Sequence, residues 1–411
     1  MLKTKNIKIE EDELMKVLFW MFIGFDQQAT SEHLLTAVIE QLCLQGHSVH
    51  IVQKNTGGNL PHIPELLLGY PITTKVIPFQ SVDKGNFIAR YLAELKYIRN
   101  CKRHFTSDYD AVFIQSTPVA GFAVRAIRKK LPRAIVTFNV QDIFPYNAVY
   151  TGTVKKNSLM FKILARIQRY GYKHSNHIIT ISEDMKETLV EDGIPDEKIK
   201  VIYNWSYQDE PYKNVDLSQV SYMFSAKYYN IVYAGNIGVM QNVDILIKAA
   251  KLMKNEKDIW FHIIGNGVYK DKLKQRAKEF GITNISFWPM MPPELAPAIY
   301  SAADVNVIPL VKNVYKTALP SKTATCLACG KPIIFAIGKE SQFADSLQKK
   351  KACCVVESNN PDELCATIRT MLLSKSSYND NAVSFFMEYC RKSNNSASYA
   401  QIIVTSSEEK R

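Results

Sequence analysis

The sequence predicts an α/β protein with two doubly wound domains, each a parallel sheet covered by helices on both faces. Short apolar runs alternate with segments of helical spacing, and the series occurs twice along the chain. A polar stretch without periodicity, residues 206–225, separates the two series. Consecutive parallel strands need a crossover, usually a helix, so this alternation favours parallel sheets. A chain of 411 residues is also too long for one ordinary core.

The first series predicts a domain over residues 1–205. Its intervening segments carry apolar residues at helical spacing, as at Leu34, Leu35, Val38 and Leu42. Strands are expected at residues 17–22, 49–52, 111–114, 135–140 and 177–181.

The second series predicts a domain over residues 206–382. Strands are expected at residues 230–234, 260–264, 285–288, 305–310, 333–336 and 353–356. The last segment, residues 383–411, has apolar positions such as Phe385, Phe386 and Tyr389. It fits a helix that crosses back to the first domain, and it fits a terminal cap equally well.

The positive charge of the chain is concentrated in one block. The net charge is +12, and residues 84–173 hold 17 Lys and Arg against four acids, or +13. Each basic cluster alone reads as a solvated helix face. A block of one sign instead favours an anionic partner, either a membrane surface or a diphosphate-bearing substrate. Nucleic acid is not expected, because no zinc finger, RNP-like motif or convincing helix-turn-helix is present.

The chain is expected to be cytoplasmic. The apolar run at residues 14–25 contains Lys16 and falls short of the roughly 20 residues that cross a bilayer. Residues 1–13 lack the apolar core of a secretory signal. Eight scattered cysteines do not form a disulfide framework, and the Cys326-x-x-Cys329 pair reads as buried helix positions because no second ligand pair follows.

Three strand-to-helix corners in the second half have phosphate-binding character. Residues 233–238 and 263–267 end apolar runs with glycines, and residues 319–323 (LPSKT) place Lys322 at a third corner. Glycine lets a bulky anion approach the backbone, and helix N-termini supply partial positive charge. Each corner alone could be a plain turn or cap. Together they suggest a nucleotide crevice along the carboxyl edge of a parallel sheet.

The order and spacing of several motifs resemble those of the family-4 glycosyltransferases of the GT-B fold, close to the bacterial branch that builds capsule, O-antigen or similar surface polysaccharides. The matching segments are residues 45–52, 140–145, 201–205, 234–242, 265–267, 303–305 and 319–332.

This resemblance implies two Rossmann-like domains facing a cleft, with a nucleotide sugar, usually a UDP-sugar, in the C-terminal domain and the acceptor in the N-terminal one. Lys322 would neutralise the β-phosphate as it leaves, with Ser321 and Thr323 donating hydrogen bonds beside it. Trp288 would lie beside the base, and core packing is its alternative. The residues expected to bind the donor are Gly235, Asn236, Gly238, Gln241, Gly265, Gly267, Trp288, Leu319, Pro320, Ser321 and Thr323.

The sequence departs from the family pattern at three places. Many relatives carry an Arg and a Lys where this chain has Asn236 and Gln241 or Asn242, so two positive charges are missing. Thr317 and Thr325 stand where paired glutamates are common, which puts the usual ribose and sugar contacts in doubt. The first loop, residues 24–30, lacks the common double glycine.

Family members retain the anomeric configuration, and the departing diphosphate assists the attacking hydroxyl. The resemblance therefore implies neither a metal nor a cofactor. Asp142 ends an apolar run in the N-terminal domain, where a carboxylate would orient or deprotonate the acceptor hydroxyl. A turn cap is an equal alternative for Asp142. Glu32 and His33 are read as an exposed pair at a helix start.

These features support one hypothesis and leave two alternatives. The hypothesis is transfer of a hexosyl or N-acetylhexosaminyl group from a UDP-sugar to a saccharide, such as one linked to a lipid diphosphate. The reaction would take place at the inner membrane face, with the basic block at residues 84–173 on the anionic lipid. The alternatives are a sugar-nucleotide epimerase of the same fold and a non-catalytic partner subunit of a glycosyltransferase.

Overall fold

The computed structural model describes residues 14–25, 32–55, 63–80, 82, 87–374 and 376–405. Residues 26–30 of the first loop and Lys84 of the basic block lie outside the described residues. The described chain divides into two compact units: the first takes in residues 1–139, 166–179 and 396–411, and the second residues 140–165 and 180–395. The predicted domain boundaries stay predictions.

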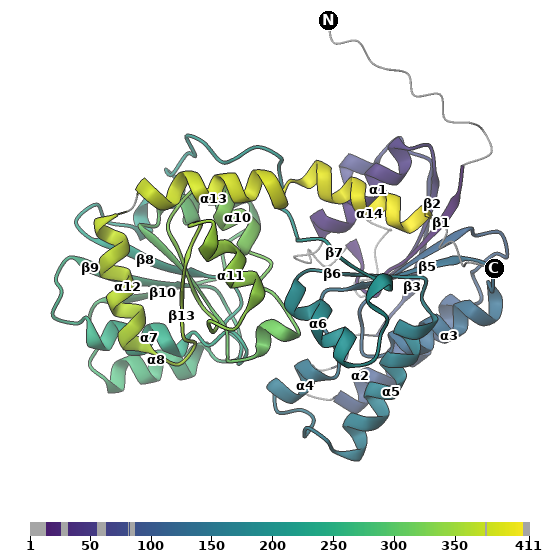
Figure 1. The fold of residues 1–411 in the computed structure, drawn as a ribbon, viewed down its shortest axis with the longest axis horizontal. Coiled ribbons are helices and arrows are strands. Elements are labelled where there is room, and N and C mark those ends of the chain that lie inside the picture. The colour runs from purple at the N-terminus through teal and green to yellow at the C-terminus, as the bar shows by residue number, and fades with distance from the viewer. Residues whose placement is uncertain are drawn as a thin grey trace, which may run out of the picture. The chain divides into compact units, whose positions relative to one another are not determined.

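The first of two parallel sheets has seven strands in the order β3-β2-β1-β4-β5-β6-β7 (Figure 1). Its strands are β1 (Lys16–Trp20), β2 (Ser48–Asn55), β3 (Ile72–Pro78), β4 (Ala111–Gln115), β5 (Ile135–Val140), β6 (His177–Thr180) and β7 (Ile199–Val201). The apolar residues of β1 are fully buried, as expected of a central strand covered on both faces. By contrast, β3 alternates half-buried and exposed positions, as an edge strand does.

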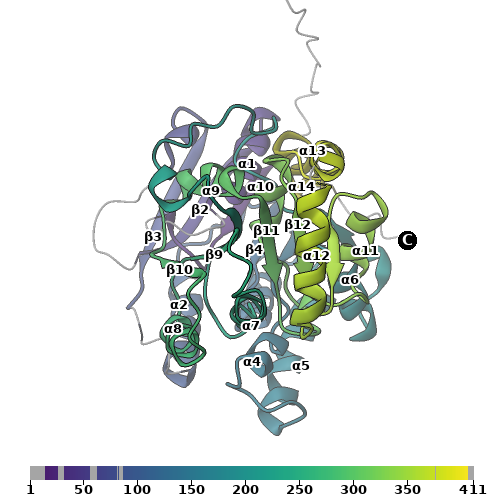
Figure 2. The same cartoon turned by 90° about the vertical axis from the view of Figure 1, so that its left-hand side faces the viewer.

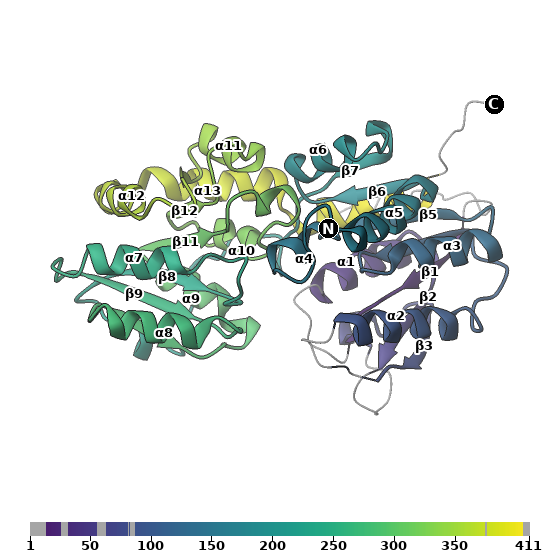
Figure 3. The same cartoon turned by 90° about the horizontal axis from the view of Figure 1, so that it is seen from below.

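Helices alternate with these strands and pack on the sheet. They are α1 (Glu32–Leu44), α2 (Phe87–Cys101), α3 (Ala120–Lys130), α4 (Tyr146–Tyr150), α5 (Leu159–His174) and α6 (Glu183–Glu191). Helix α1 contacts β2, α2 contacts β3 and α3, and α3 contacts β4 (Figure 3). Helix α6 begins at a Ser182 cap whose side chain accepts from the Met185 amide.

The second sheet has six strands in the order β10-β9-β8-β11-β12-β13. They are β8 (Tyr229–Ala234), β9 (Ile259–Ile264), β10 (Ile285–Trp288), β11 (Val305–Pro309), β12 (Ile333–Ala336) and β13 (Cys354–Val356). The α/β class and the two parallel sheets predicted from the sequence are confirmed.

Alternate residues of these strands belong to two separate cores, one on each face of the second sheet. Ile231 and Tyr233 face the core formed with α7 (Asp244–Leu252), α8 (Lys270–Glu279) and α12 (Pro361–Leu373). Val232 and Ala234 face the other core, formed with α9 (Ala296–Ala302), α10 (Thr323–Ala328), α11 (Gln342–Lys349) and α13 (Ser376–Tyr389). Figure 2 shows α12 lying along the sheet, where it contacts β11, β12 and β13.

The C-terminal segment forms two helices. Helix α13 packs against α10 in the second unit, and most of α14 (Lys392–Val404) belongs to the first unit. Within the first unit the Tyr399 hydroxyl donates to Asn139 Oδ1 over 3.2 Å. The polar stretch at residues 206–225 is not a free linker, because Val220 and Met223 are buried in the second unit's core. No helix among the described residues is long and apolar enough to cross a membrane.

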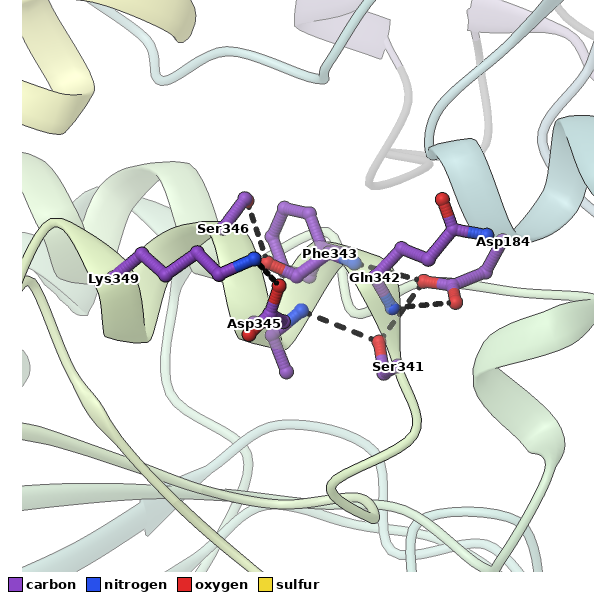
Figure 4. Close-up of polar contacts among 8 residues, drawn as sticks. Asp184, Ser341, Gln342, Phe343, Asp345, Ser346 and Lys349 are labelled. Atoms are coloured by element: carbon purple, nitrogen blue, oxygen red, sulfur yellow. Dashed lines mark hydrogen bonds and ion pairs between the residues drawn. The ribbon is translucent and has the colours of Figure 1, made fainter.

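A buried carboxylate connects α6 to α11 inside the second unit. Asp184 is 2% exposed, and its oxygens accept from Ser341 Oγ (2.9 Å), the Gln342 amide (2.8 Å) and the Phe343 amide (3.0 Å) (Figure 4). A negative charge is favourable at a helix N-terminus, where the first amides lack helical partners. Burial nevertheless raises the pKa of Asp184 against the lowering effect of these three donors.

Replacing Asp184 by Asn should lower the free energy of unfolding by about 3 kcal/mol, because the new amide group would face amide and hydroxyl donors. Thermal and denaturant unfolding measure the change. Asp345→Asn is the matched control, since Asp345 is exposed on α11, the helix whose N-terminus Asp184 contacts, and pairs with Lys349 at 2.6 Å. A loss of less than about 0.5 kcal/mol is expected there. Equal stability of the two variants would contradict the structural role of Asp184.

Candidate functional site

The residues predicted to bind the donor lie at the ends of β8, β9 and β10 and after β11, so they flank the point where the strand order of this sheet reverses. β8 and β11 are neighbours, and the chain proceeds from β8 toward β9 and β10 on one side and from β11 toward β12 and β13 on the other. Loops at the carboxyl ends of two such strands leave in opposite directions. Ligands of open α/β sheets bind at this switch point.

Two loops there touch backbone to backbone. The Gly235 amide donates to Ile264 O (2.9 Å), and the Ile237 amide donates to Asn266 O (2.8 Å). A Cβ on Gly265 would lie 1.8 Å from Gly235 O, and a Cβ on Gly267 would lie 2.3 Å from Ile237 O. Both glycines also have positive φ, +146° and +156°. The predicted glycines are therefore required for the approach of the loops themselves.

Lys322 lies against the same loop. Its ammonium is 3.9 Å from the centroid of the Tyr233 ring, and it would be 2.6 Å from a Cβ placed on Gly235. The bare Cα of Gly235 thus makes room for the cation. Among the described residues no carboxylate lies within ion-pair distance of Lys322. Burial lowers the pKa of its ammonium to about 8.

The other polar side chains of this loop form hydrogen bonds within the loop or to Ser358. Gln241 Oε1 accepts from the Gly238 amide (3.1 Å) and from Asn236 Nδ2 (3.3 Å). Asn242 Nδ2 donates to Ser358 O (2.5 Å). Because the amides of Gly235, Ile237 and Gly238 already have acceptors, the positive charge of the site rests on Lys322 rather than on loop amides.

The segment before Lys322 is held by four contacts within the second unit. Asp142 forms an antiparallel bridge with Ala318, and the Ile143 amide donates to Thr317 O (2.8 Å). Thr188 Oγ1 donates to Lys316 O (2.8 Å), and the Tyr150 hydroxyl donates to Asn313 O (3.0 Å). The predicted catalytic residue Asp142 is thereby linked through the backbone to the loop that carries Lys322.

The Asp142 carboxylate remains chemically available. Asp142 is an exposed residue. The protein around its carboxyl group nevertheless displaces enough water to raise the pKa of that group to about 6. Asn147 Nδ2 opposes this shift by donating to Asp142 Oδ1 over 2.9 Å. At neutral pH the group is mostly ionised and can accept a proton.

The remaining residues of the LPSKT segment differ in exposure. Leu319 and Pro320 are half-buried, and Ser321 is exposed. Thr323 is buried and its hydroxyl donates to Pro320 O (2.8 Å), so in this conformation it cannot also donate to a ligand. Glu32 and His33 lie at the start of α1, in the first unit, and are half-buried rather than exposed as predicted.

Thr317 and Thr325 are structural here. Thr317 Oγ1 donates to Val314 O (3.1 Å), and Thr325 Oγ1 is 3.1 Å from Ser206 Oγ. Both threonines are almost fully buried. Thr317 and Thr325, at the positions where many relatives are expected to carry glutamates, therefore form hydrogen bonds inside the protein.

Trp288 is half-buried and belongs to a buried polar chain that sequence reasoning missed. Its Nε1 donates to His262 Nδ1 (3.2 Å), and His262 Nε2 is 3.1 Å from Asn230 Oδ1. Burial lowers the pKa of His262 to about 4, so the ring is neutral at pH 7. His262 and Asn230 occupy inward positions of apolar strands, which is the signal that could have revealed them.

Lys270 was also missed. Its ammonium donates to Gly265 O and to Trp288 O, each over 2.6 Å. A lysine in the first turn of a helix, directly after a Gly-x-Gly turn, opposes the helix dipole, and this conflict was visible in the sequence. Among the described residues, no three His, Cys, Asp or Glu side chains gather as metal ligands.

Two family models match the chain one after the other. The model described as "Glycosyltransferase Family 4" matches residues 31–205, and "Glycosyl transferases group 1" matches residues 228–374. The chain belongs to the group 1/family 4 glycosyltransferases. The predicted family is thus confirmed.

Curated relatives of this glycosyltransferase chain are distant. It is 26% identical to the probable glycosyltransferase WbjE of Pseudomonas aeruginosa, over 55% of the chain and 58% of WbjE. It is 27% identical to the putative colanic acid biosynthesis glycosyl transferase WcaI of Escherichia coli K12, over 53% of the chain and 54% of WcaI. The match thus spans little more than half the length of each relative.

Solved structures share the fold of this glycosyltransferase. Anabaena Alr3699/HepE in complex with UDP and glucose superposes with a TM-score of 0.71 at 15% identity, covering 94% of this chain and 98% of that one. WaaG, a glycosyltransferase involved in lipopolysaccharide biosynthesis, superposes with a TM-score of 0.69 at 13% identity, covering 95% and 100%. The GT-B fold is confirmed.

Gly265→Ala should destabilise the second unit by more than about 3 kcal/mol, because the new methyl group would meet a backbone oxygen that cannot rotate away. Chemical denaturation measures the loss. Gly281→Ala is the matched control: Gly281 also has positive φ, +59°, but nothing lies within 4 Å of its added Cβ. It should cost only about 1–2 kcal/mol. Similar losses in both variants would contradict the backbone contact.

Proposed function

We propose that this protein is a retaining glycosyltransferase that transfers a sugar from a UDP-sugar to a saccharide acceptor. The observation that carries the proposal is the ammonium of Lys322 on the bare Cα of Gly235, at the switch point of the second sheet. Family membership supports it, as do the similar structures of HepE in complex with UDP and glucose, with UDP and with UDP-glucose.

Lys322 supplies the electrostatic part of the chemistry. When the bond between the anomeric carbon and the β-phosphate oxygen breaks, negative charge grows on the diphosphate. A fixed ammonium beside that oxygen stabilises the transition state more than the ground state. The ammonium needs little reorganisation, because the Tyr233 ring already holds it. On the side of β9 and β10, Gly265, Gly267 and Trp288 would take the base.

Asp142 is assigned to the acceptor. Its ionised carboxylate would orient the attacking hydroxyl or accept its proton, while the leaving diphosphate assists on the same face of the sugar. The bridge between Asp142 and Ala318 couples this carboxylate to the segment that carries Lys322. A few residues of backbone, from Ala318 to Lys322, would then connect the carboxylate that receives the acceptor proton to the ammonium that stabilises the leaving group.

Lys322→Met should lower kcat for the donor by roughly 10²–10³-fold, because it removes one charge from the leaving-group site and keeps the side-chain length. Release of UDP from a panel of UDP-hexoses and UDP-N-acetylhexosamines measures the effect. Lys316→Met, a half-buried lysine just upstream, is the control and should stay within about twofold. An unchanged Lys322→Met rate would refute the phosphate role.

The pH profile separates the two residues further. In kcat/KM, which reports the free enzyme, activity should fall below about pH 6 as Asp142 is protonated and above about pH 8 as Lys322 loses its proton. Asp142→Asn should lose the acidic limb, and Lys322→Met should lose the alkaline one. Retention of both limbs in both variants would contradict the assignments.

A second candidate is a non-catalytic partner subunit, favoured by the buried threonines at the glutamate positions. Wild-type protein that binds UDP but releases none from any UDP-sugar would support this candidate instead.

The acceptor we propose is a saccharide on a lipid diphosphate, in surface polysaccharide synthesis at the inner face of the membrane. WcaI, by its name a colanic acid biosynthesis enzyme, supports the pathway class. The basic block supports the membrane contact, although not every cluster in it is free. Arg128 donates to His174 O and Ala134 O, and Lys130 donates to Lys102 O. These two side chains serve the fold.

The start of α5 carries the better membrane surface. Leu159, Met160 and Ile163 are 72%, 45% and 47% exposed, an unusual set of apolar side chains on one short stretch. Exposed lysines flank them at positions 155, 156 and 162. Apolar side chains that insert among lipids, ringed by lysines that bind anionic headgroups, fit an anionic bilayer surface.

Reversal of Lys155, Lys156 and Lys162 to Glu should reduce sedimentation with phosphatidylglycerol vesicles at least tenfold, since each lysine near such a surface contributes about 1 kcal/mol. Reversal of the exposed Lys254, Lys257 and Lys278 to Glu makes the same change of charge elsewhere and should have much less effect. Equal binding by both triple variants would exclude a role for the α5 surface.

A further inference from the structure

Lys270 is a buried, charged side chain at a position where the fold does not require a charge. It is the first residue of α8 and is 9% exposed. Its ammonium donates to two carbonyl oxygens, those of Gly265 and Trp288, and no carboxylate within the described part of the chain lies at ion-pair distance. It is a buried cation held by neutral partners.

This placement is electrostatically unfavourable. A positive side chain in the first turn of a helix faces the positive end of the helix dipole. Burial lowers the pKa of Lys270, as does the like charge of Lys274, and Asp271 only partly offsets these effects. A leucine or methionine would fill the same space without this cost, so the contacts that the ammonium makes are the reason to look for a role.

Those contacts join the carboxyl ends of β9 and β10. Trp288 O accepts from both Lys270 Nζ and the Gly265 amide, the latter over 3.3 Å, and Gly265 O accepts from Lys270 as well. The lysine thus closes a ring of hydrogen bonds around the two strand ends. Parallel strands would otherwise splay where their ladder stops.

The ring is continuous with the loop under Lys322. Residues 265–267 continue from it to the backbone contact with Gly235 and Ile237, and the Tyr269 amide donates to Ile237 O (3.1 Å). Lys322 lies beside that contact, at the Cα of Gly235. Two ammonium groups therefore contact this pair of loops, one at Gly235 and one at the ends of β9 and β10.

We propose that Lys270 is a positioning residue for the nucleoside half of the donor: it fixes the Gly265 loop and Trp288 relative to each other, as the surface against which the uridine would lie. This inference rests on the proposed function. Lys270 acts through the two carbonyls and the loop, whereas Lys322 acts on the diphosphate. The two lysines should therefore respond differently to ligands that carry only part of UDP.

The test compares Lys270→Met with Lys274→Met, an exposed lysine one helical turn later, by calorimetric binding of UDP, UMP and pyrophosphate. Lys270→Met should weaken UDP and UMP by a similar factor of about tenfold, with pyrophosphate within twofold. In turnover, KM for the UDP-sugar should rise while kcat changes little. Lys274→Met should match wild type, and Lys270→Arg should recover most of the UDP affinity.

The possible results separate a failure of the role proposed for Lys270 from a failure of the proposed transferase function. Wild-type protein that does not bind UDP would overturn the proposed function, and the inference with it. Wild-type protein that binds UDP, with Lys270→Met binding UDP equally well or losing pyrophosphate by the same factor, would overturn the inference alone. Should Lys270→Met not fold, Lys270→Leu, which also lacks a donor for the two carbonyls, carries the same comparison.

Discussion

The site depends on the contact between two stretches of backbone, Gly235 to Ile237 against Gly265 to Gly267. A single Cβ at Gly265 would lie 1.8 Å from Gly235 O, so no side chain fits between the loops. Lys322 lies against the bare Cα of Gly235 and the ring of Tyr233, beside this contact. On the other strand ends, Gly265 O and Trp288 O lie within hydrogen-bond distance of Lys270. Close packing here sets the positions of charges, since a rigid backbone cannot give way as a flexible side chain can.

The charges at this edge share an uncommon property. Lys322 and Lys270 are held by a ring face and by carbonyl oxygens, and in the described structure neither has a carboxylate within ion-pair distance. A buried ion pair would stabilise each ammonium but would also neutralise it. Without a carboxylate partner among the described residues, each ammonium keeps its positive potential for an anionic ligand. For the same reason little offsets the burial that lowers the pKa of Lys322 and that of Lys270. Asp142 has a matching cost, because its crowded surroundings disfavour its ionised form.

Much of this architecture was predictable from the sequence, because buried parallel strands are continuous apolar runs bounded by glycine and polar residues. The strands at residues 135–140, 285–288 and 333–336 have the predicted bounds. The prediction missed β3, whose polar alternation marks an edge strand, and β7, which has only three residues. It placed Gly235 and Gly265 at the ends of strands and Lys322 at the start of a helix, as the structure has them, since glycine and a corner lysine carry a local signal. It could not foresee that the Thr323 and Thr325 hydroxyls turn inward, nor the pairing of Trp288 with His262, because those contacts join residues far apart in the chain or depend on side-chain direction.

The ring of Tyr233 under Lys322 has a consequence for the end of the catalytic cycle. A lysine that is paired with a carboxylate in the empty protein must break that ion pair to bind a phosphate. It forms the pair again when the product leaves, and each exchange adds a barrier. Here the ammonium instead lies over the aromatic face of Tyr233. In the proposed transferase, departure of the nucleotide would then require only that water replace phosphate oxygens around the ammonium, and the side chain of Lys322 would already be in place for the next donor.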